Sequence, residues 1–454
     1  MIDMATNFNS VRPILNENFN KVYIETYGCQ MNVSDSEVVL SILQPQGYSL
    51  SRNYKDASLI LINTCSIREN AEQRVWARLR ELNSLKRKNR ALKIGVLGCM
   101  AERLEAELLD SGLVDMVAGP DSYRTLPQLI DGANSGELAA NTILSQEESY
   151  ADITPVRLDK NGVSAFVSIM RGCNNFCTYC VVPYVRGRER SRDPKTILEE
   201  VKLLFESGYR EVTLLGQNVN SYCAGENITF AKLLEQVALI APQLRVRFST
   251  SHPKDIGREL IDTIAAFPNI CKHIHLPVQS GSNSVLKRMN RNYSREEYLQ
   301  KIDYIKKRVP NCSISTDIIA GFSGESEEEH QETLSIMREV GYYTAFMFQY
   351  SQREGTVAAK RYPNDVPPKV KGRRLQEIIE LQNSLSLLSN QNDVGQEFEI
   401  LVEGRSKRNK EELFGRSSQN KVVIIPAKGH KVGDFVKVRV TSCSSATLKG
   451  EAVE

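Results

Sequence analysis

Three short apolar runs near the start of the chain share one pattern: each ends at a cysteine, and a helical stretch follows it. The runs are Val22 to Cys29, Leu59 to Cys65 and Ile94 to Cys99. Apolar residues recur at helical spacing from Asp35 onward, from Arg68 to Lys88 and from Ala101 to Leu109. Strands and helices that alternate in this way predict a doubly wound parallel sheet.

The three cysteines are expected at one edge of that sheet, because ligands of such sheets bind beyond the carboxyl ends of the strands. Taken singly, each of Cys29, Cys65 and Cys99 is typical of a small buried hydrophobe. Their matching positions favour a shared ligand instead. Iron–sulfur clusters take cysteine thiolates, and most four-iron clusters take four of them. A set of three therefore predicts a cluster with one open iron.

Six further strands alternate with helical stretches in the middle of the chain. The expected helices include Pro194–Ser207 and Ser282–Val309. Six such units in a row favour an open or partial TIM-type (βα)6 barrel. The strands are expected at Ser164–Met170, Glu211–Gly216, Arg245–Ser249, His273–Gln279, Ser313–Ile319 and Thr344–Tyr350.

A second cysteine set follows the first of these strands, where the catalytic loops of such barrels lie. Cys173, Cys177 and Cys180 have the spacing C-x3-C-x2-C. A zinc site usually shows two separated pairs or a Cys/His mixture, and no partner pair follows this run. A disulfide would leave an odd thiol and would need an oxidising compartment. Three thiolates again predict a cluster whose open iron can hold a substrate.

Polar residues cluster just after the other strands of the middle segment. Gln217, Gln279 and Asp317 need hydrogen-bond partners there, and a polar cofactor in the barrel mouth would supply them. We predict cofactor contacts from these three residues together with Tyr179 and Ser249. His252, His273 and His275 have no third well-placed ligand, so structural or hydrogen-bonding roles are favoured over metal binding.

The last segment changes character. Pro363 to Pro368 predicts a break, and Lys369 to Asn392 a polar bridging helix. Short alternating strands follow and predict a small β-barrel. Barrels of this kind often bind oligonucleotides, although a purely structural appendage remains an alternative. The strands are expected at Glu397–Val402, Lys421–Ile425, Asp434–Val440 and Ala446–Glu451.

Length and charge add two limits. The 454 residues suggest about three domains. A net charge of +3 does not by itself establish a nucleic-acid partner. Basic residues do cluster at Arg186 to Lys195, Lys369 to Arg374 and Arg405 to Lys410. Each cluster alone is typical of a solvated face, but three of them favour a polyanionic partner.

Targeting signals are not evident in the sequence. No apolar run approaches the roughly 18 residues of a membrane span. Met1 to Asn20 is polar, without the apolar core of a secretory signal, and is expected to be a disordered lead-in. A cytoplasmic location follows as the expectation, and there cysteines stay reduced and act as ligands or catalysts.

Several long stretches match one family in one order. They include Thr26 to Asn32, Asn63 to Asn70, Gly98 to Arg103, Cys173 to Arg192 and His275 to Asn283. From about Lys21 to its end, the chain resembles the radical S-adenosylmethionine methylthiotransferases. One departure is Ser323, where the family usually has proline. The glycines around it remain, so little functional consequence is expected.

The resemblance implies three domains and two 4Fe-4S clusters. A methylthiotransferase domain over residues 21–150, after the lead-in over 1–20, would hold an auxiliary cluster on Cys29, Cys65 and Cys99. A radical barrel with a bridging helix would span 159–391, and its own three cysteines would generate the radical from S-adenosylmethionine. A C-terminal TRAM domain over 392–454 would bind RNA, and contacts are predicted for Tyr184, Arg186, Arg188, Arg405, Lys407 and Arg408.

The stretches Cys173 to Tyr184 and Gln279 to Ser282 resemble one branch of the family most closely. That branch methylthiolates carbon 2 of N6-isopentenyl-adenosine next to the tRNA anticodon. Two molecules of S-adenosylmethionine per turnover and a reductant such as flavodoxin or ferredoxin are expected, while the sulfur donor is left open. Alternatives are methylthiolation of threonylcarbamoyl-adenosine in tRNA, methylthiolation of a ribosomal-protein aspartate, and a non-catalytic iron–sulfur sensor.

Overall fold

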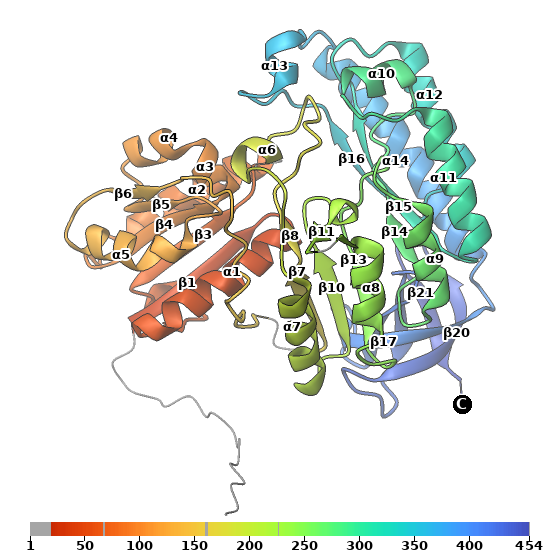
Figure 1. The fold of residues 1–454 in the computed structure, drawn as a ribbon, viewed down its shortest axis with the longest axis horizontal. Helices are drawn as coiled ribbons and strands as arrows, with labels where there is room; N and C mark the ends of the chain where they lie inside the picture. The colour runs from red at the N-terminus through yellow and green to blue at the C-terminus, as the bar shows by residue number, and fades with distance from the viewer. Residues whose placement is uncertain (1–19, 67–68, 159–161, 226, 454) are drawn as a thin grey trace, which may run out of the picture.

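The computed structural model describes residues 20–66, 69–158, 162–225 and 227–453. Figure 1 shows three units in chain order: an N-terminal sheet with helices in red and orange, a larger middle unit, and a C-terminal barrel in blue. Apart from Asn20, the expected lead-in lies outside the described residues. Within the described ranges, no helix has both the length and the apolar character that crossing a membrane requires.

The N-terminal sheet has six parallel strands in the order β2-β1-β3-β4-β5-β6. Its order reverses beside β1, because β2 lies on one side of that strand and β3 on the other. Ligands of doubly wound sheets bind at this kind of switch point. The strands are β1 (Asn20–Tyr27), β2 (Tyr48–Leu50), β3 (Leu59–Thr64), β4 (Lys93–Gly98), β5 (Met116–Ala118) and β6 (Ala139–Asn141).

Two separate apolar cores show that helices cover both faces of this sheet, which confirms the predicted doubly wound fold. One core includes α1 (Gln30–Leu43) and α5 (Leu126–Asn134). The other includes α2 (Glu69–Leu85), α3 (Cys99–Arg103) and α4 (Glu105–Asp110). The expected single helix from Ala101 to Leu109 is therefore wrong, because the backbone leaves the helical region at Leu104.

The middle unit is a partial barrel of six parallel strands in two halves, as predicted. The strand orders are β13-β10-β7 and β14-β15-β16, and one bridge between Val246 and Ile270 extends the first half. The strands are β7 (Ser164–Ser168), β10 (Glu211–Leu215), β13 (Arg245–Phe248), β14 (His273–His275), β15 (Ser313–Ala320) and β16 (Thr344–Gln349).

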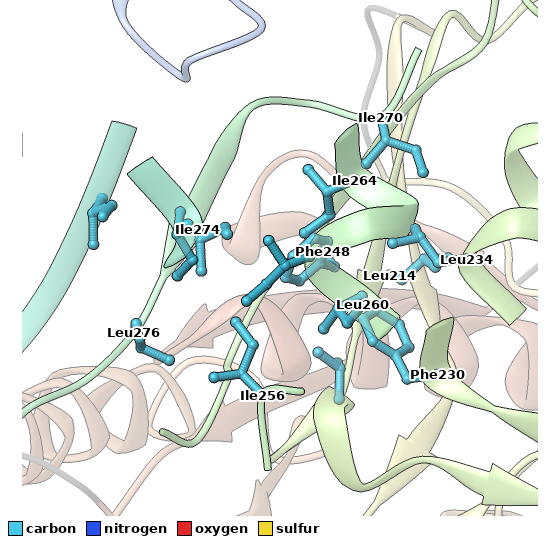
Figure 2. Packing of buried hydrophobic residues seen from close by; sticks show 14 of the residues in the cluster. Leu214, Phe230, Leu234, Phe248, Ile256, Leu260, Ile264, Ile270, Ile274 and Leu276 are labelled. Carbon is cyan, nitrogen blue, oxygen red and sulfur yellow. The ribbon is translucent and has the colours of Figure 1, made fainter. Parts of the chain in front are cut away.

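Helices pack against the outside of this barrel and bury its largest apolar core. Figure 2 shows part of that core, including Phe230, Phe248, Leu260, Ile264 and Ile274. The main helices are α7 (Pro194–Glu206), α8 (Phe230–Ala238), α9 (Arg258–Ala266), α10 (Asn283–Arg288), α11 (Arg295–Arg308), α12 (Glu327–Val340) and α14 (Pro368–Gln391). Short elements at the mouth are β8 (Met170–Arg171), α6 (Val182–Val185), β9 (Arg190–Ser191), β11 (Cys223–Ala224), β12 (Ile228–Thr229) and α13 (Val357–Arg361).

The expected continuous helix Ser282–Val309 is wrong, since α10 ends at Arg288 and α11 begins at Arg295. Asn290 and Asn292 between them have φ values of 57° and 54°, in the left-handed region that asparagine tolerates. The Asn290 side chain donates a hydrogen bond to the carbonyl oxygen of Phe176 over 3.1 Å. The break therefore ties this segment to the loop of the second cysteine set.

The C-terminal unit is a closed five-stranded barrel, which confirms the predicted small β-barrel. The expectation of four strands missed β18, whose alternating residues include Gly415 and Arg416. The barrel order is β17-β18-β19-β21-β20. The strands are β17 (Glu397–Arg405), β18 (Glu412–Ser417), β19 (Val422–Pro426), β20 (Phe435–Cys443) and β21 (Leu448–Ala452).

This barrel docks on the amino ends of the middle strands. Arg245 and Arg247 of β13 donate to the carbonyl oxygens of Arg416 and Ser417, each over 2.7 Å. Buried Glu211 at the start of β10 accepts from Arg416 over 2.9 Å. In Figure 1 the blue barrel accordingly lies at the end of the middle unit opposite α6 and α13. The carboxyl ends of the strands are left for the cysteine loops.

Candidate functional site

The first cysteine set lies at the switch point of the N-terminal sheet. Cys29 and Cys65 follow β1 and β3, and Cys99 follows β4 directly. The Cys29 and Cys99 thiols both act on the pKa of the Cys65 thiol, so the three sulfurs lie near one another. The structure thus brings together the three residues that were predicted to share a ligand.

Two buried asparagines hold the loops of this set together. The Asn32 side chain donates to Asn63 Oδ1 over 3.1 Å and to the Thr64 carbonyl oxygen over 3.0 Å. Its own Oδ1 accepts from the backbone nitrogen of Cys29 over 3.3 Å. Gly28 is required beside them, because a Cβ atom there would lie 2.5 Å from Asn32 Oδ1 at a φ of +147°. These contacts fix the loops that carry Cys29 and Cys65 relative to each other.

The electrostatics of the first set favour thiolates. The neighbouring Cys65 thiol lowers the pKa of Cys29 to about 6 and that of Cys99 to about 7, and Arg186 lowers both further. The same neighbours raise the pKa of Cys65 well above its usual range. Metal binding requires deprotonated cysteines, so two of the three sulfurs are already close to the state that a metal needs.

The second set lies in the loop that follows β7 and β8. The Cys180 nitrogen donates to the Cys177 carbonyl oxygen over 3.0 Å, and Asn175 Nδ2 lies 3.5 Å from Cys173 Sγ. Burial raises the pKa of Cys173 to about 11, and burial together with Cys177 raises that of Cys180 to about 12. These thiols are protonated at neutral pH until a metal displaces the protons.

Two residues outside the loop fix its geometry. Arg291, in the break between α10 and α11, donates from Nη1 to Cys177 Sγ over 3.2 Å. Gln217, after β10, accepts from the Gly172 backbone nitrogen over 2.6 Å. Sequence reasoning missed Arg291, because its neighbours resemble an ordinary helical stretch.

The other predicted cofactor contacts lie toward the same end of the barrel. Tyr179 packs edge-on against Phe322, with ring centroids 6.4 Å apart. Gln279 is buried with a φ of +68°, a strained value typical of a functional loop. Asp317 Oδ2 lies 3.5 Å from His275 Nε2, and the Ser249 nitrogen donates to the Leu214 carbonyl oxygen. Their contacts to a cofactor stay predictions.

The histidines have the hydrogen-bonding roles that were expected. His273 Nε2 and His275 Nδ1 each lie 3.0 Å from the hydroxyl oxygen of Ser315. His252 Nδ1 accepts from the Lys254 backbone nitrogen over 3.2 Å.

The two cysteine sets meet at the boundary between the first two units. Cys99 packs with Val181 and Val185, and Val181 directly follows Cys180. Arg186, at the end of α6, donates from Nε to Cys99 Sγ over 3.1 Å. Cys180, the last cysteine of the second set, is therefore directly followed by Val181, whose side chain packs with Cys99 of the first set.

The predicted RNA contacts divide into two groups. Five are exposed: Tyr184, Arg188, Arg405, Lys407 and Arg408. Arg186 instead is only 3% exposed and bonds to Cys99 and Asp35, so a contact with RNA would require it to leave both partners.

Several arginines in two of the three basic clusters form internal ion pairs, while Arg188, Lys195, Lys369 and Arg373 of these clusters stay exposed. Arg190 and Arg192 pair with Asp121 and Glu200, and Arg374 pairs with Glu325. The cluster from residue 405 to residue 410 stays exposed apart from one half-buried serine, Ser406. The longest run of exposed basic residues that could face a polyanion therefore lies on the C-terminal barrel.

Comparison with known proteins matches each unit to a family. Residues 167–337 match the radical SAM superfamily, residues 21–119 the uncharacterized protein family UPF0004, and residues 391–453 the TRAM domain. A tRNA-2-methylthio-N(6)-dimethylallyladenosine synthase of Phocaeicola vulgatus is 57% identical over 437 residues, 95% of this chain and 96% of that protein. The chain belongs to this synthase family.

Other members of the synthase family match over a similar length. The synthase of Azobacteroides pseudotrichonymphae is 54% identical and covers 96% of this chain and 97% of its own length. Among solved structures, the radical S-adenosylmethionine methyltransferase TsrM from Kitasatospora setae aligns with a TM-score of 0.57 at 12% identity, over 75% of this chain and 74% of that one. That likeness shows a shared fold.

Membership of the synthase family confirms the predicted cofactors, two 4Fe-4S clusters and S-adenosylmethionine. The cysteine sets fit such clusters. The first set offers three sulfurs on adjoining loops and the second set three sulfurs on one loop, and each set receives a hydrogen bond from one buried arginine, Arg186 or Arg291. Hydrogen bonds to sulfur are a usual means of tuning such clusters.

Proposed function

We propose that this chain methylthiolates carbon 2 of N6-isopentenyl-adenosine next to the anticodon of tRNA, and that it consumes two molecules of S-adenosylmethionine in doing so. The observation that carries the proposal is the meeting of two cysteine sets through Cys99, Val181 and Arg186. Two adjacent sets of three thiolates suit a reaction that needs both a radical and a sulfur atom. Relatives of the same length that are named for this reaction support it.

The chemistry requires a cofactor, because carbon 2 of adenine carries an unactivated C–H bond that no side-chain acid or base removes at useful rates. When bound, the reduced cluster on Cys173, Cys177 and Cys180 would supply the electron that cleaves S-adenosylmethionine. The protein orients the reactants and excludes water. Gln217 and Arg291 hold the loop that carries these cysteines, and Asn32 and Asn63 hold the other set.

An RNA substrate is supported by where the exposed basic residues and the exposed Tyr184 lie. Tyr184 and Arg188 are exposed at the mouth of the middle barrel, while Arg405, Lys407 and Arg408 belong to the C-terminal barrel at its other end. Strands of five or six residues separate the two ends by about 15–20 Å. A stem-loop can reach both ends, whereas a free nucleoside cannot. The target base would turn into the barrel mouth, as other base-modifying enzymes require.

The deciding experiment is anaerobic. The reconstituted protein is reduced and incubated with S-adenosylmethionine and with tRNA that either carries or lacks the isopentenyl group, and nucleosides are analysed by mass spectrometry. We expect methylthiolation only of the isopentenylated tRNA. Product on threonylcarbamoyl-adenosine, or on a ribosomal-protein aspartate supplied separately, would favour a sister activity. No cleavage of S-adenosylmethionine would favour a non-catalytic iron–sulfur protein.

We propose that the two cysteine sets divide the reaction: the cluster on Cys29, Cys65 and Cys99 would carry the sulfur, and the cluster on Cys173, Cys177 and Cys180 would generate the radical. The double variant Cys29→Ala/Cys65→Ala should still cleave S-adenosylmethionine but should form no methylthiolated product. Methylthiolation by this variant would refute the division.

RNA contact is tested by salt dependence. Each phosphate contact contributes a slope of about 0.7–0.9 to the logarithmic salt dependence of binding. Arg188→Ala and Arg408→Ala should each reduce that slope, while Lys202→Ala, an exposed lysine on α7, should not. Unchanged tRNA affinity and slope in both arginine variants would count against this surface.

We also propose a cytoplasmic location and a flavodoxin or ferredoxin as reductant.

A further inference from the structure

Arg186 belongs to the middle unit, but both of its side-chain partners belong to the N-terminal unit. Its side chain is 3% exposed. Nε donates to Cys99 Sγ over 3.1 Å, and Nη2 donates to Asp35 Oδ2 over 2.7 Å. A buried guanidinium without such partners would cost several kcal/mol, so the contacts hold the residue in place.

Asp35 connects this contact to the start of the other cysteine loop. Its second oxygen, Oδ1, accepts from Arg171 Nη1 over 2.8 Å, and Arg171 lies two residues before Cys173. One carboxylate of α1 therefore clamps both ends of the loop that carries Cys173, Cys177 and Cys180. The end of that loop, Arg186, then reaches the sulfur of Cys99.

The nearby Arg192 shows how a purely structural arginine differs. It is also buried, and it uses Nε, Nη1 and Nη2 in bonds to Thr196, Ser168 and Glu200. Arg186 Nη1, by contrast, is buried without a partner within the described part of the chain. An unpaired buried N–H costs about 1–3 kcal/mol, and this nitrogen belongs to the side chain that also contacts Cys99.

We propose that Arg186 is a positioning residue of the auxiliary site. It sets the reduction potential of the cluster on Cys29, Cys65 and Cys99, and it fixes that cluster relative to the loop that carries Cys173, Cys177 and Cys180. The inference rests on the proposed function only in placing an auxiliary cluster on these cysteines. A cationic donor to a ligand sulfur stabilises the reduced, more negative state of a cluster and so raises its reduction potential. Loss of Arg186 should therefore lower that reduction potential. It should also weaken the contact that holds the two cysteine sets in place relative to each other.

The first test isolates the auxiliary cluster. The full chain carrying Cys173→Ala, Cys177→Ala and Cys180→Ala is reconstituted with Arg186, Arg186→Gln, Arg186→Lys or Arg192→Gln. The midpoint potential is then followed by electron paramagnetic resonance during redox titration. We expect a more negative potential for Arg186→Gln, a smaller shift for Arg186→Lys, and no shift for Arg192→Gln, which also loses a buried arginine but touches no cysteine.

For the isolated auxiliary cluster, an unchanged reduction potential in Arg186→Gln with four irons bound would overturn the inference. Failure of Arg186→Gln to bind the cluster, while Arg192→Gln binds it fully, supports the role at Cys99. Equal failure of both variants would show only a general loss of stability and would overturn the inference.

The second test uses chains with all six cysteines. Arg186→Gln should lower methylthiolated product about tenfold or more, the usual effect of losing an outer partner of a metal ligand, while cleavage of S-adenosylmethionine falls less. Equal loss of both activities would overturn the positioning role. If the wild-type chain makes no methylthiolated product but the potential still shifts, the proposed function fails and this inference stands.

Discussion

Arg291 Nη1 lies 3.2 Å from the sulfur of Cys177 and donates a hydrogen bond to it. The arginine is 4% exposed, and its other nitrogens donate to the Pro277 carbonyl oxygen and the Tyr293 hydroxyl. Arg186 makes the matching contact with Cys99. Each cysteine set thus receives one buried guanidinium from a different loop, although the two sets lie on unrelated folds.

Replacement of Arg291 should slow the radical half of the reaction. In Arg291→Lys the charge remains, but one ammonium group cannot serve Cys177, Pro277 and Tyr293 together. We expect cleavage of S-adenosylmethionine to fall about 10–100-fold, the range seen for outer partners of metal ligands. The assay follows 5′-deoxyadenosine without tRNA, with Lys287→Gln, an exposed position on α10, as the control. If Arg291→Lys cleaves S-adenosylmethionine at the wild-type rate, Arg291 does not support the function of the second cysteine set.

Much of this arrangement could be predicted from local sequence patterns. Alternating and helical periods place the strands that end at Cys29, Cys65 and Cys99, because the apolar run and its cysteine are neighbours in the chain. The spacing of Cys173, Cys177 and Cys180 likewise needs only one loop. These features depend on contacts within a few residues.

Features that depend on distant partners could not be predicted. A run of basic residues looks the same in the sequence whether it lies on a surface or in an interface. The carboxylate that pairs with buried Arg186 belongs to Asp35, 151 residues earlier in the chain. The break that carries Arg291 was hidden because Val285, Leu286 and Met289 continue a helical period up to it. The Asn290 side chain donates to the carbonyl oxygens of Asn175 and Phe176, which lie 115 and 114 residues earlier, and these distant contacts accompany the end of the helix.

The glycine before Cys173 should be essential to the second cysteine set. A Cβ atom on Gly172 would lie 1.9 Å from the Arg188 carbonyl oxygen, and its φ of +78° already disfavours other residues. Gly172→Ala should therefore bind about four irons per chain in place of about eight, because the first set is untouched. Gly208→Ala is the matched control, since Gly208 has a φ of +98° but nothing within 4 Å. Equal iron content in both variants would contradict the steric argument.

Glu102 should make the metal-free protein less stable in alkali. Burial, with Asp121, Glu105 and Cys99 nearby, raises the pKa of Glu102 to about 8. An unfolded glutamate ionises near 4.5, so the folded state holds an extra proton between these values and stability falls as pH rises through that window. Glu102→Gln removes this loss. We expect equal melting at pH 4 and a gain of about 1–4 kcal/mol for the variant at pH 8.5.

Thermal melting of the metal-free chain at both pH values measures the effect of Glu102. Glu107→Gln is the control, because Glu107 is an exposed residue of the next helix, α4. A gain of the same size at pH 4 and at pH 8.5 would show that ionisation of Glu102 is not its cause.

Glu211 should hold the C-terminal barrel on the middle unit. The carboxylate is fully buried, and its two oxygens accept from Arg247 over 2.7 Å and from Arg416 over 2.9 Å. Removal of one partner from a buried charge network costs about 3–5 kcal/mol, because the remaining charges lose their compensation. Glu211→Ala should therefore release the barrel to proteolysis after α14 while both cysteine sets still bind iron. Glu411→Ala, an exposed change in the β17–β18 hairpin, should leave the proteolysis pattern unchanged.

Acid provides an independent check of the Glu211 contact in the wild-type chain. Burial alone would raise the pKa of Glu211, but Arg247 and Arg416 hold it below its usual value of 4.5. Its contribution is therefore complete above pH 4.5 and is lost only as pH falls through the lowered folded value. Resistance of the C-terminal barrel to proteolysis should persist at pH 5 in the wild-type chain and be absent at that pH in Glu211→Ala. Release of the barrel from the wild-type chain at pH 5 would show that this carboxylate does not control docking.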